Sequence, residues 1–280
     1  MKKQLIGLVA MALSVCAMET KAQIVPPPSS AQTISQGFGL GKITLTYARP
    51  NVKGRKIFGG LEPYGTVWRT GANNATSLKF SDEVIINNTK VPAGEYGLFS
   101  IPGETEWTII LSKKPQQWGA YTYSDKDDLM RFKVKNEKLK DLTETMYLDF
   151  INVTPTTCDL QMKWERSSFV FHIVTDIDAK VVARIDSAMA TAKKPLYDAI
   201  IYYYNNNKDM DKALVWANEL EKTPGMPAWA SKMWKARVQL KKGDKAGAIA
   251  TATAGIEAAK KDKNDEYVRL NSEIIAQAKK

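Results

Sequence analysis

The sequence predicts an α+β protein, in which an antiparallel β-sandwich of jelly-roll-like type is followed by a small all-α domain of helical hairpins. Two observations support this prediction. From Lys42 onward, apolar residues alternate with polar ones in short stretches that turn residues separate. At Asp176 the apolar spacing changes to about four residues, which is typical of amphipathic helices. We therefore expect a sandwich in residues 32–175 and a helical tail in residues 176–280.

Residues 1–22 have the features of a signal peptide. Two lysines precede a short apolar run, and Thr20-Lys21-Ala22 supplies a small-residue cleavage site. That run is too short to span a bilayer as a helix, and we expect no transmembrane segment in the rest of the chain. We therefore predict export to the periplasm or the extracellular space. A lipid anchor at Cys16 is the alternative, which we favour less because Val15 stands where such signals have a small residue.

Residues 23–31 include three consecutive prolines and are predicted to form an extended linker. Ten short strands should follow, since strand-like alternation recurs at a spacing typical of a sandwich and no helical period lies between the strands. The expected strands are residues 42–47, 76–80, 83–87, 95–101, 106–112, 119–123, 129–135, 145–153, 157–165 and 168–174.

The tail should begin with a helix near Asp176 and end with a helix at residues 265–278. Within it, residues 208–214 align with residues 243–249 at an offset of 35 residues. This resembles tetratricopeptide-type repeats, although Lys208 stands where the motif has glycine. We expect the tail to pack on the sandwich, or alternatively to hold a protein partner. The aromatic residues expected in the core between the helices are Tyr202, Tyr203, Tyr204, Trp216, Trp229 and Trp234.

The net charge of +10 is spread along the chain. Residues 23–175 contain 18 basic and 15 acidic side chains, and residues 176–280 contain 19 and 14. A nucleic-acid-binding face would concentrate the basic residues. The sequence therefore predicts no nucleic-acid partner.

Neither histidine nor cysteine occurs in a pattern that indicates catalysis or metal binding. His172 is the one histidine in the chain and is expected on the outer face of its strand. Cys158 is the one cysteine after residue 22 and is expected to be a small buried hydrophobic residue. We therefore predict no metal site, no cofactor and no histidine-based catalytic triad.

Residues 47–76 are the most unusual stretch. They hold three of the eight arginines and five of the 17 glycines, where strand alternation stops. A basic turn at residues 53–56 could hold a phosphate, sulfate or carboxylate, or be a solvated loop. Arg69 could present its donors to a ligand, or to the carbonyls of its own loop. With two aromatic residues that could stack on a sugar, the candidate ligand-binding residues are Arg49, Lys53, Arg55, Trp68, Arg69, Asn73, Trp118 and Tyr121.

Acidic residues allow a second hypothesis, because a glycosidase needs only two suitably placed carboxylates. Asp125, Asp127 and Asp128 cluster after a pair of tyrosines, and Glu144, Asp149 and Glu165 lie on later strands. The alternative, which we favour, is a solvated turn whose acids pair with Arg131 or with lysines.

Several short motifs resemble the family catalogued as domain of unknown function 2911. The motifs are Arg49-Pro50, Lys53-Gly54-Arg55, Ile57-Phe58-Gly59, Pro63-Tyr64-Gly65, the run Val67 to Asn73, Ala93-Gly94 with Tyr96, Leu98-Phe99, Ile101-Pro102, Trp107 and Trp118-Gly119. The resemblance covers about residues 32–175. It implies a secreted or periplasmic β-rich bacterial domain, often followed by a repeat-like helical tail, and it implies no activity.

From the sequence we expect an exported cell-envelope protein that is a non-catalytic binding module for an anionic or glycan ligand. The alternatives are a carbohydrate-active hydrolase that uses Asp128 with a partner acid, and a scaffold that binds a protein through the helical tail. The most useful single observation is which side chains of residues 47–76 point into a pocket and which point into the core.

Overall fold

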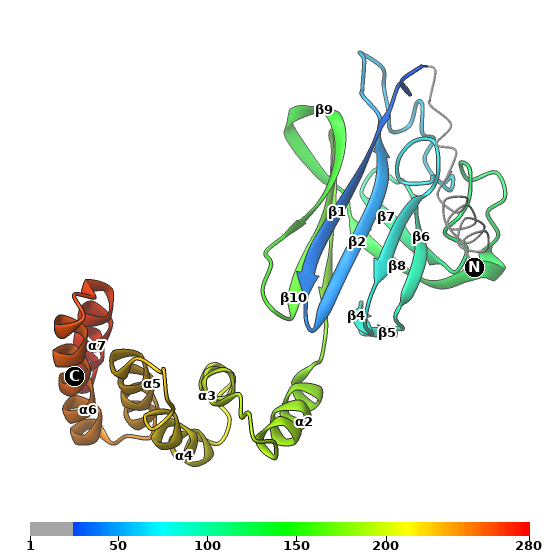
Figure 1. Ribbon diagram of the computed structural model, residues 1–280. Helices are drawn as coiled ribbons and strands as arrows, with labels where there is room; N and C mark the ends of the chain where they lie inside the picture. Colours follow the sequence, from blue (N-terminus) through cyan, green and yellow to red (C-terminus); the bar gives the residue numbers. More distant parts are fainter. Residues whose placement is uncertain (1–24) are drawn as a thin grey trace, which may run out of the picture. The chain divides into compact units, whose positions relative to one another are not determined.

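A computed structural model describes residues 25–280 (Figure 1). The predicted signal peptide and the alternative anchor at Cys16 lie outside the described residues. The chain divides into two compact units, of which the second is Asp178–Lys280. No helix in the described part of the chain is long and apolar enough to cross a membrane.

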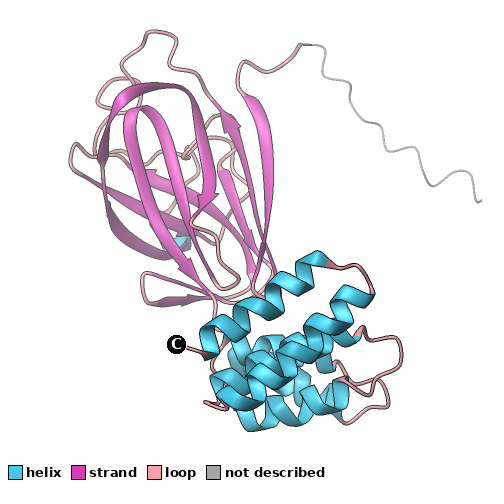
Figure 2. Ribbon diagram, turned by 90° about the vertical axis from the view of Figure 1, so that its left-hand side faces the viewer, coloured by secondary structure: helices cyan, strands magenta, loops and turns pink. Residues whose placement is uncertain are grey.

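The first unit contains two antiparallel sheets, as predicted (Figure 2). The larger sheet has the strand order β1-β2-β3-β6-β7-β8 and the smaller has the order β5-β4-β10-β9. The strands of the larger sheet are β1 (Ser30–Phe38), β2 (Gly41–Arg49), β3 (Thr76–Phe80), β6 (Gly94–Ile101), β7 (Glu106–Ser112) and β8 (Asp128–Lys135). Those of the smaller sheet are β4 (Val84–Ile86), β5 (Thr89–Val91), β9 (Glu137–Ile151) and β10 (Thr157–Val174).

Both sheets contribute to one hydrophobic core. Leu45 and Leu78 of the larger sheet belong to the same buried cluster as Leu148, Leu160 and Phe171 of the smaller one. The polar residues that alternate with them, such as Thr46 and Lys79, are exposed. Period-two alternation therefore places one apolar face of each sheet against the other, which is the arrangement of a sandwich.

The strand predictions were wrong in five places. The strand β1 lies partly inside the predicted linker and was missed, because this edge strand is polar and mostly exposed. The short strand β5 was also missed. Residues 119–123 form turns instead of a strand. The two predicted strands 157–165 and 168–174 form the single strand β10, whose register shifts at Glu165. The ladder of β9 begins at Glu137, because its polar first half pairs with β10 without facing the core.

The second unit contains six helices: α2 (Asp178–Met189), α3 (Leu196–Asn205), α4 (Met210–Leu220), α5 (Ala228–Lys241), α6 (Lys245–Lys261) and α7 (Asp265–Ala278). The last helix has the predicted bounds. Asp209 and Asp244, which the 35-residue offset aligns, cap α4 and α6 in the same way, since each accepts hydrogen bonds from backbone N–H groups of the first turn. Ala213 and Ala248 are both fully buried, so the aligned segments are structurally equivalent.

The aromatic residues of the second unit pack between helices. Tyr203 of α3 meets Trp216 of α4 edge to face at 4.7 Å, and Tyr204 meets Trp234 of α5 at 5.7 Å. Trp229 lies 4.1 Å from Tyr267 of α7, measured between ring centroids. These contacts agree with the predicted core. Packing of the tail on the sandwich, and a partner held by the tail, stay predictions.

Candidate functional site

The segment between β2 and β3 closes one end of the sandwich by attaching to both sheets. Its first part pairs with the smaller sheet, since Met146 N donates to Pro50 O at 2.9 Å and Val52 N donates to Glu144 O at 2.8 Å. Its last part pairs with the larger sheet, since Trp68 and Ser100 exchange backbone hydrogen bonds at 2.7 and 2.9 Å. The segment therefore bridges the sheets.

Trp68 anchors this segment to the hydrophobic core, and its side chain is 3 % exposed. Its ring stacks on Trp164 of β10 at 5.7 Å and contacts Phe58 and Trp107 edge to face. Its Nε1 donates to the carbonyl of Gly71 at 3.1 Å. The indole thus belongs to the core and holds the turn that contains Gly71. The sequence predicted that Trp68 would bind a ligand, but its side chain does not line the cleft.

The turn of residues 69–73 is also held by its own polar groups. Thr70 Oγ1 shares a 2.8 Å hydrogen bond with Ser100 Oγ, and Thr76 Oγ1 donates to Thr70 O at 2.7 Å. Thr70 has a φ of +51°, which is unusual for a β-branched residue. Asn73 also has a positive φ, and its Nδ2 donates to Ser29 O at 3.2 Å. These bonds hold the turn in a strained conformation without any contribution from the Arg69 side chain.

A cleft of about 320 Å³ lies between the two ends of the segment. The charged side chains that line it are Lys53, Arg55, Glu62 and Arg69. Asn73 and Trp164 complete its polar and aromatic wall. Three cationic groups therefore face one acidic group, and the cleft favours an anionic ligand.

The three predicted arginines differ in what they bind. Arg49 Nε donates to Met146 O at 3.2 Å, and Arg55 donates from Nε and Nη2 to the carbonyls of Val52 and Asn51. Both side chains thus tie the backbone. The Arg69 guanidinium, by contrast, makes no hydrogen bond to any described residue, and its Nε is completely buried without a partner. The protein therefore leaves the donors of Arg69 unused, and because this guanidinium lines the cleft it is the group best placed to bind a ligand.

A second buried donor is unpaired in the wall of the cleft. Trp164 is 1 % exposed, and its Nε1 has no hydrogen-bond partner among the described residues. The next residue, Glu165, has a φ of +55° and accepts hydrogen bonds from the backbone N–H groups of Ile57 and Phe58. A register shift in β10 therefore positions both the indole and the loop opposite it.

Glu62 is the acidic residue of the cleft, and its ionisation is perturbed. Burial raises the pKa of Glu62 to about 7, although the positive charges of Arg69 and Arg55 lower it in part. Its carboxyl group makes no hydrogen bond or ion pair with the residues that the structure describes. Near neutral pH the net charge of the cleft therefore depends on whether Glu62 carries a proton.

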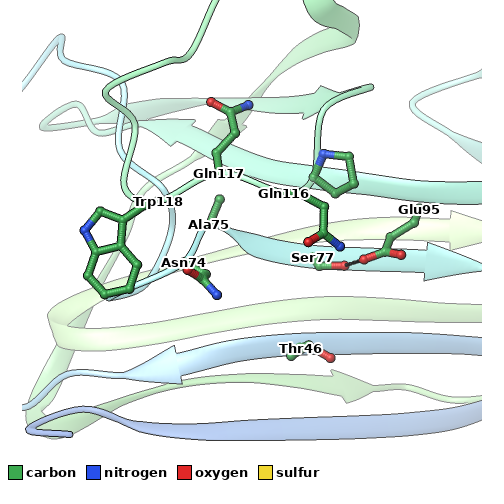
Figure 3. A pocket seen from close by; sticks show the side chains of 9 residues that line it. Thr46, Asn74, Ala75, Ser77, Glu95, Gln116, Gln117 and Trp118 are labelled. Atoms are coloured by element: carbon green, nitrogen blue, oxygen red, sulfur yellow. Dashed lines mark hydrogen bonds between the residues drawn. The ribbon is translucent and has the colours of Figure 1, made fainter. Parts of the chain in front are cut away.

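The cleft continues into a groove across the outer face of the larger sheet. A middle hollow of about 310 Å³ shares Ser29, Ala72 and Asn73 with the cleft. It shares Asn74 and Trp118, among other residues, with an outer hollow of about 370 Å³ (Figure 3). The three hollows thus adjoin one another through shared lining residues, and we call the middle and outer hollows together the groove.

The outer hollow presents amides and one exposed indole. Trp118 is 65 % exposed. In Figure 3 the Gln116 side chain points toward the strands, whereas Gln117 points away. Gln117 is buried, and its Nε2 donates to Lys114 O at 2.8 Å. The side chains of Asn74 and Gln116 make no hydrogen bond with the described part of the chain, so their donors and acceptors are open to a ligand.

The structure brings together five of the eight residues predicted to bind a ligand. Lys53, Arg55, Arg69 and Asn73 line the cleft, and Trp118 lines the connected groove. Arg49 and Trp68 support the fold instead, and Tyr121 is 83 % exposed and lines none of the three hollows.

Sequence reasoning missed several residues of the site. Glu62 was not predicted as a site residue, and its raised pKa follows from burial that no sequence pattern predicts. Trp164 was not predicted as a site residue, because it lies within the expected strand 157–165. Asn74 and Gln116 carried no signal, since exposed amides are common in loops.

The acidic turn proposed for a hydrolase is internally paired. Tyr123 Oη donates to both carboxylate oxygens of Asp128 at 2.9 Å, and Arg131 forms an ion pair with the same group. Lys114 pairs with Asp127 at 2.8 Å. Burial, with the Asp128 carboxylate beside it, raises the pKa of Tyr123 to about 12. The turn thus matches the structural alternative.

The one cysteine and the one histidine among the described residues line none of the three hollows. Cys158 is a free, buried thiol, and burial raises its pKa to about 12, which makes it unreactive as expected. His172 is exposed, as predicted, and its Nδ1 lies 2.6 Å from Asp159. No group of three or more potential metal ligands occurs in residues 25–280.

Comparison with known proteins identifies the family and adds no activity. Searches of curated proteins and of solved structures found no match. A family model described as "Protein of unknown function (DUF2911)" matches residues 29–173, in agreement with the motifs in the sequence. Because this match covers more than half of the 280 residues, the chain belongs to the DUF2911 family of proteins of unknown function.

Proposed function

We propose that this protein is a non-catalytic binding module whose cleft holds an anionic ligand. The observation that carries the proposal is the Arg69 guanidinium, which lies in the cleft with a fully buried Nε and no hydrogen-bond partner among the described residues. Such a group can form paired charge-assisted hydrogen bonds with a carboxylate or a phosphate. Lys53 and Arg55 add positive charge beside it.

The number of acidic residues that line the cleft favours a binding site over a glycosidase active site. A glycosidase that works by two carboxylates needs both within one site, and Glu62 is the single acidic residue among the described residues that line the cleft. Other acids considered already have partners in the protein: Asp128 pairs with Arg131, Glu165 accepts from Ile57 and Phe58, and Glu144 accepts from the backbone N–H of Lys53. The hydrolase hypothesis therefore gains no support.

We also propose export to the cell envelope, on the basis of residues 1–22, and we keep a protein partner of the helical unit as a further proposal. The first is tested by N-terminal sequencing of the secreted or periplasmic protein. A mature N-terminus near Gln23 supports export by signal cleavage. A protein that stays in the cytoplasm with an intact N-terminus contradicts it.

Calorimetric titration of the full chain with glucuronate, inorganic phosphate and neutral glucose tests the anion site. We expect the anions to bind and glucose not to bind. Arg69→Gln should weaken anion binding by at least about tenfold, since it removes a charge-assisted pair. The matched control is Lys133→Gln, because Lys133 loses the same charge but lies on β8 in an exposed ion pair with Glu106.

Two results would contradict the proposal. One is the absence of binding for both anions. The other is anion binding that Arg69→Gln and Lys133→Gln weaken equally, because this would indicate attraction to the net positive charge rather than to the cleft. Circular dichroism of Arg69→Gln checks that the variant is folded, and we expect it to be, since the Arg69 side chain makes no bond that holds the turn.

A further inference from the structure

The groove that leaves the cleft is fixed to it by the backbone. Asn74 and Trp118 form an isolated antiparallel bridge, Gly119 N donates to Asn73 O at 3.0 Å, and Ala75 N donates to Gln117 O at 2.8 Å. Asn73, which lines the cleft, is thus adjacent in the chain to the residue that pairs with Trp118. The exposed indole and the Arg69 cleft therefore keep a constant separation and can contact two parts of one ligand.

The chemistry of the groove changes along its length. The cleft end is cationic through Arg55 and Arg69. The middle hollow is lined by four alanines, which offer apolar contact: Ala31, Ala48, Ala72 and Ala75. The outer hollow has one charged residue, Glu95, whose carboxylate accepts a 2.6 Å hydrogen bond from Ser77. An anionic group is thus favoured at the first end and disfavoured at the other.

The outer hollow has the groups that recognise a sugar ring. An exposed indole such as Trp118 packs against the apolar C–H face of a pyranose, and side-chain amides both donate to and accept from hydroxyls. The amides of Asn74 and Gln116 and the Glu95 carboxylate border the same hollow. Each hollow has a volume between 310 and 370 Å³, at the lower end of the range for small-ligand sites. Three adjoining hollows of this size together have room for a short chain of sugars.

We propose that the ligand is an acidic oligosaccharide, whose uronic-acid carboxylate binds at Arg69 and whose neutral sugars follow the groove to Trp118. This inference rests on the proposed anion-binding function and adds the class of the ligand and its direction in the groove. It predicts that affinity comes from two separate places, and that each can be removed without the other.

The test compares three probes by calorimetric titration of the full chain: glucuronate, xylotriose, and aldotriouronic acid, which joins one glucuronic acid to two neutral xyloses. Aldotriouronic acid should bind at least about tenfold more tightly than either of the other probes. Trp118→Ala should reduce its affinity to that of glucuronate and leave glucuronate binding unchanged. Arg69→Gln should weaken glucuronate and aldotriouronic acid alike.

Two variants control for damage to the loop. Tyr121→Ala removes an even more exposed aromatic ring from the same loop. Because Tyr121 does not line the groove but lies near Arg69 Nη1 across Gly119, the ratio of the two affinities should stay the same even if both change. Trp118→Phe keeps an aromatic face and should retain most of the affinity for aldotriouronic acid. An equal change of this ratio in Trp118→Ala and Tyr121→Ala would overturn the assignment to Trp118.

The outcomes separate the two proposals. If glucuronate binding depends on Arg69 but aldotriouronic acid binds no more tightly, or Trp118→Ala has no effect, the oligosaccharide inference fails and the anion site stands. If no anionic probe binds, the proposed function fails and the inference fails with it. If xylotriose binds as tightly as aldotriouronic acid, the groove holds a neutral glycan, and the role given to Arg69 is wrong.

Discussion

Charged side chains gather in two regions of the first unit. In one region the charged groups are paired with each other, and in the other they are not. In the acidic turn around Asp128, hydrogen bonds and ion pairs join Tyr123, Arg131, Lys114 and Asp127. In the cleft, Arg69 has no partner among the described residues, and the pKa of Glu62 is raised to about 7. The paired groups stabilise the fold. The unpaired groups of the cleft lower the stability of the protein unless a ligand binds to them. Whether charged groups have partners within the protein therefore distinguishes a structural cluster from a candidate binding site.

The largest expected effect is a difference in stability between two variants, each of which removes one charged side chain from one of the regions. The Asp128 side chain is 9 % exposed and binds both Tyr123 and Arg131, so Asp128→Ala should lower the free energy of unfolding by about 2 kcal/mol. Arg69→Gln breaks no hydrogen bond and removes an unpaired buried donor, so it should leave the free energy of unfolding unchanged or raise it by up to about 1 kcal/mol. Urea unfolding measures both, and glucuronate titration should show the reverse order. Equal losses of stability in the two variants would remove the distinction.

The raised pKa of Glu62 makes the stability of the protein depend on pH, which gives a second test of the cleft. Its pKa in the folded protein, about 7, exceeds the ordinary value of 4.5, so the folded state binds more protons than the unfolded state between these values. The stability that this group contributes is complete below about pH 4.5 and is lost as the pH rises through 7. Glu62→Gln should therefore match the wild type at pH 4 and be more stable by about 1 kcal/mol at pH 8, after allowance for solvent screening.

The matched control for this measurement is Glu106→Gln. Glu106 is exposed and pairs with Lys133 on the surface, so this substitution should shift stability little, and equally at both pH values. A gain in Glu62→Gln that is the same at pH 4 and at pH 8 would show that Glu62 is not protonated in the folded protein near neutral pH.

The same proton should govern ligand binding. When Glu62 is ionised, its carboxylate competes with an anionic ligand for Arg69 and Arg55, so glucuronate affinity should fall about threefold to tenfold between pH 6 and pH 8. Glu62→Gln should remove this dependence. Calorimetry at pH 7 in buffers of different ionisation heat should also record proton uptake on binding. An affinity that does not change with pH in the wild type would exclude this coupling.

How far the sequence predicts this protein depends on which residues face the core. Strands such as β3 and β7 were predicted because buried and exposed positions alternate, while β1 and the start of β9 were missed because their residues are polar on both faces. In the site, composition indicated Lys53, Arg55, Arg69 and Asn73. It could not show which arginine is unpaired, because the carbonyl that satisfies Arg49 belongs to Met146, far along the chain.

The smallest expected effect concerns strain at the rim of the cleft. Lys53 and Gly54 both have positive φ, and Arg55 N donates to Val52 O at 3.1 Å, which makes residues 52–55 a type I′ turn. Asparagine is favoured at the first central position of such a turn, so Lys53→Asn should stabilise the protein by about 0.5 kcal/mol. It should also weaken glucuronate binding about twofold to threefold, because an ammonium group leaves the rim.

Opposite signs of the two effects would show that the lysine is retained for binding at a cost in stability, as the unpaired Arg69 is. Thermal unfolding and glucuronate titration of the same sample measure them. The matched control is Gly54→Ala, which places a Cβ at a φ of +69° in open space and should only destabilise. If Lys53→Asn stabilised the protein and left glucuronate affinity unchanged, the rim would be an ordinary solvated turn, and the anion site would be confined to Arg69, Arg55 and the wall formed by Trp164.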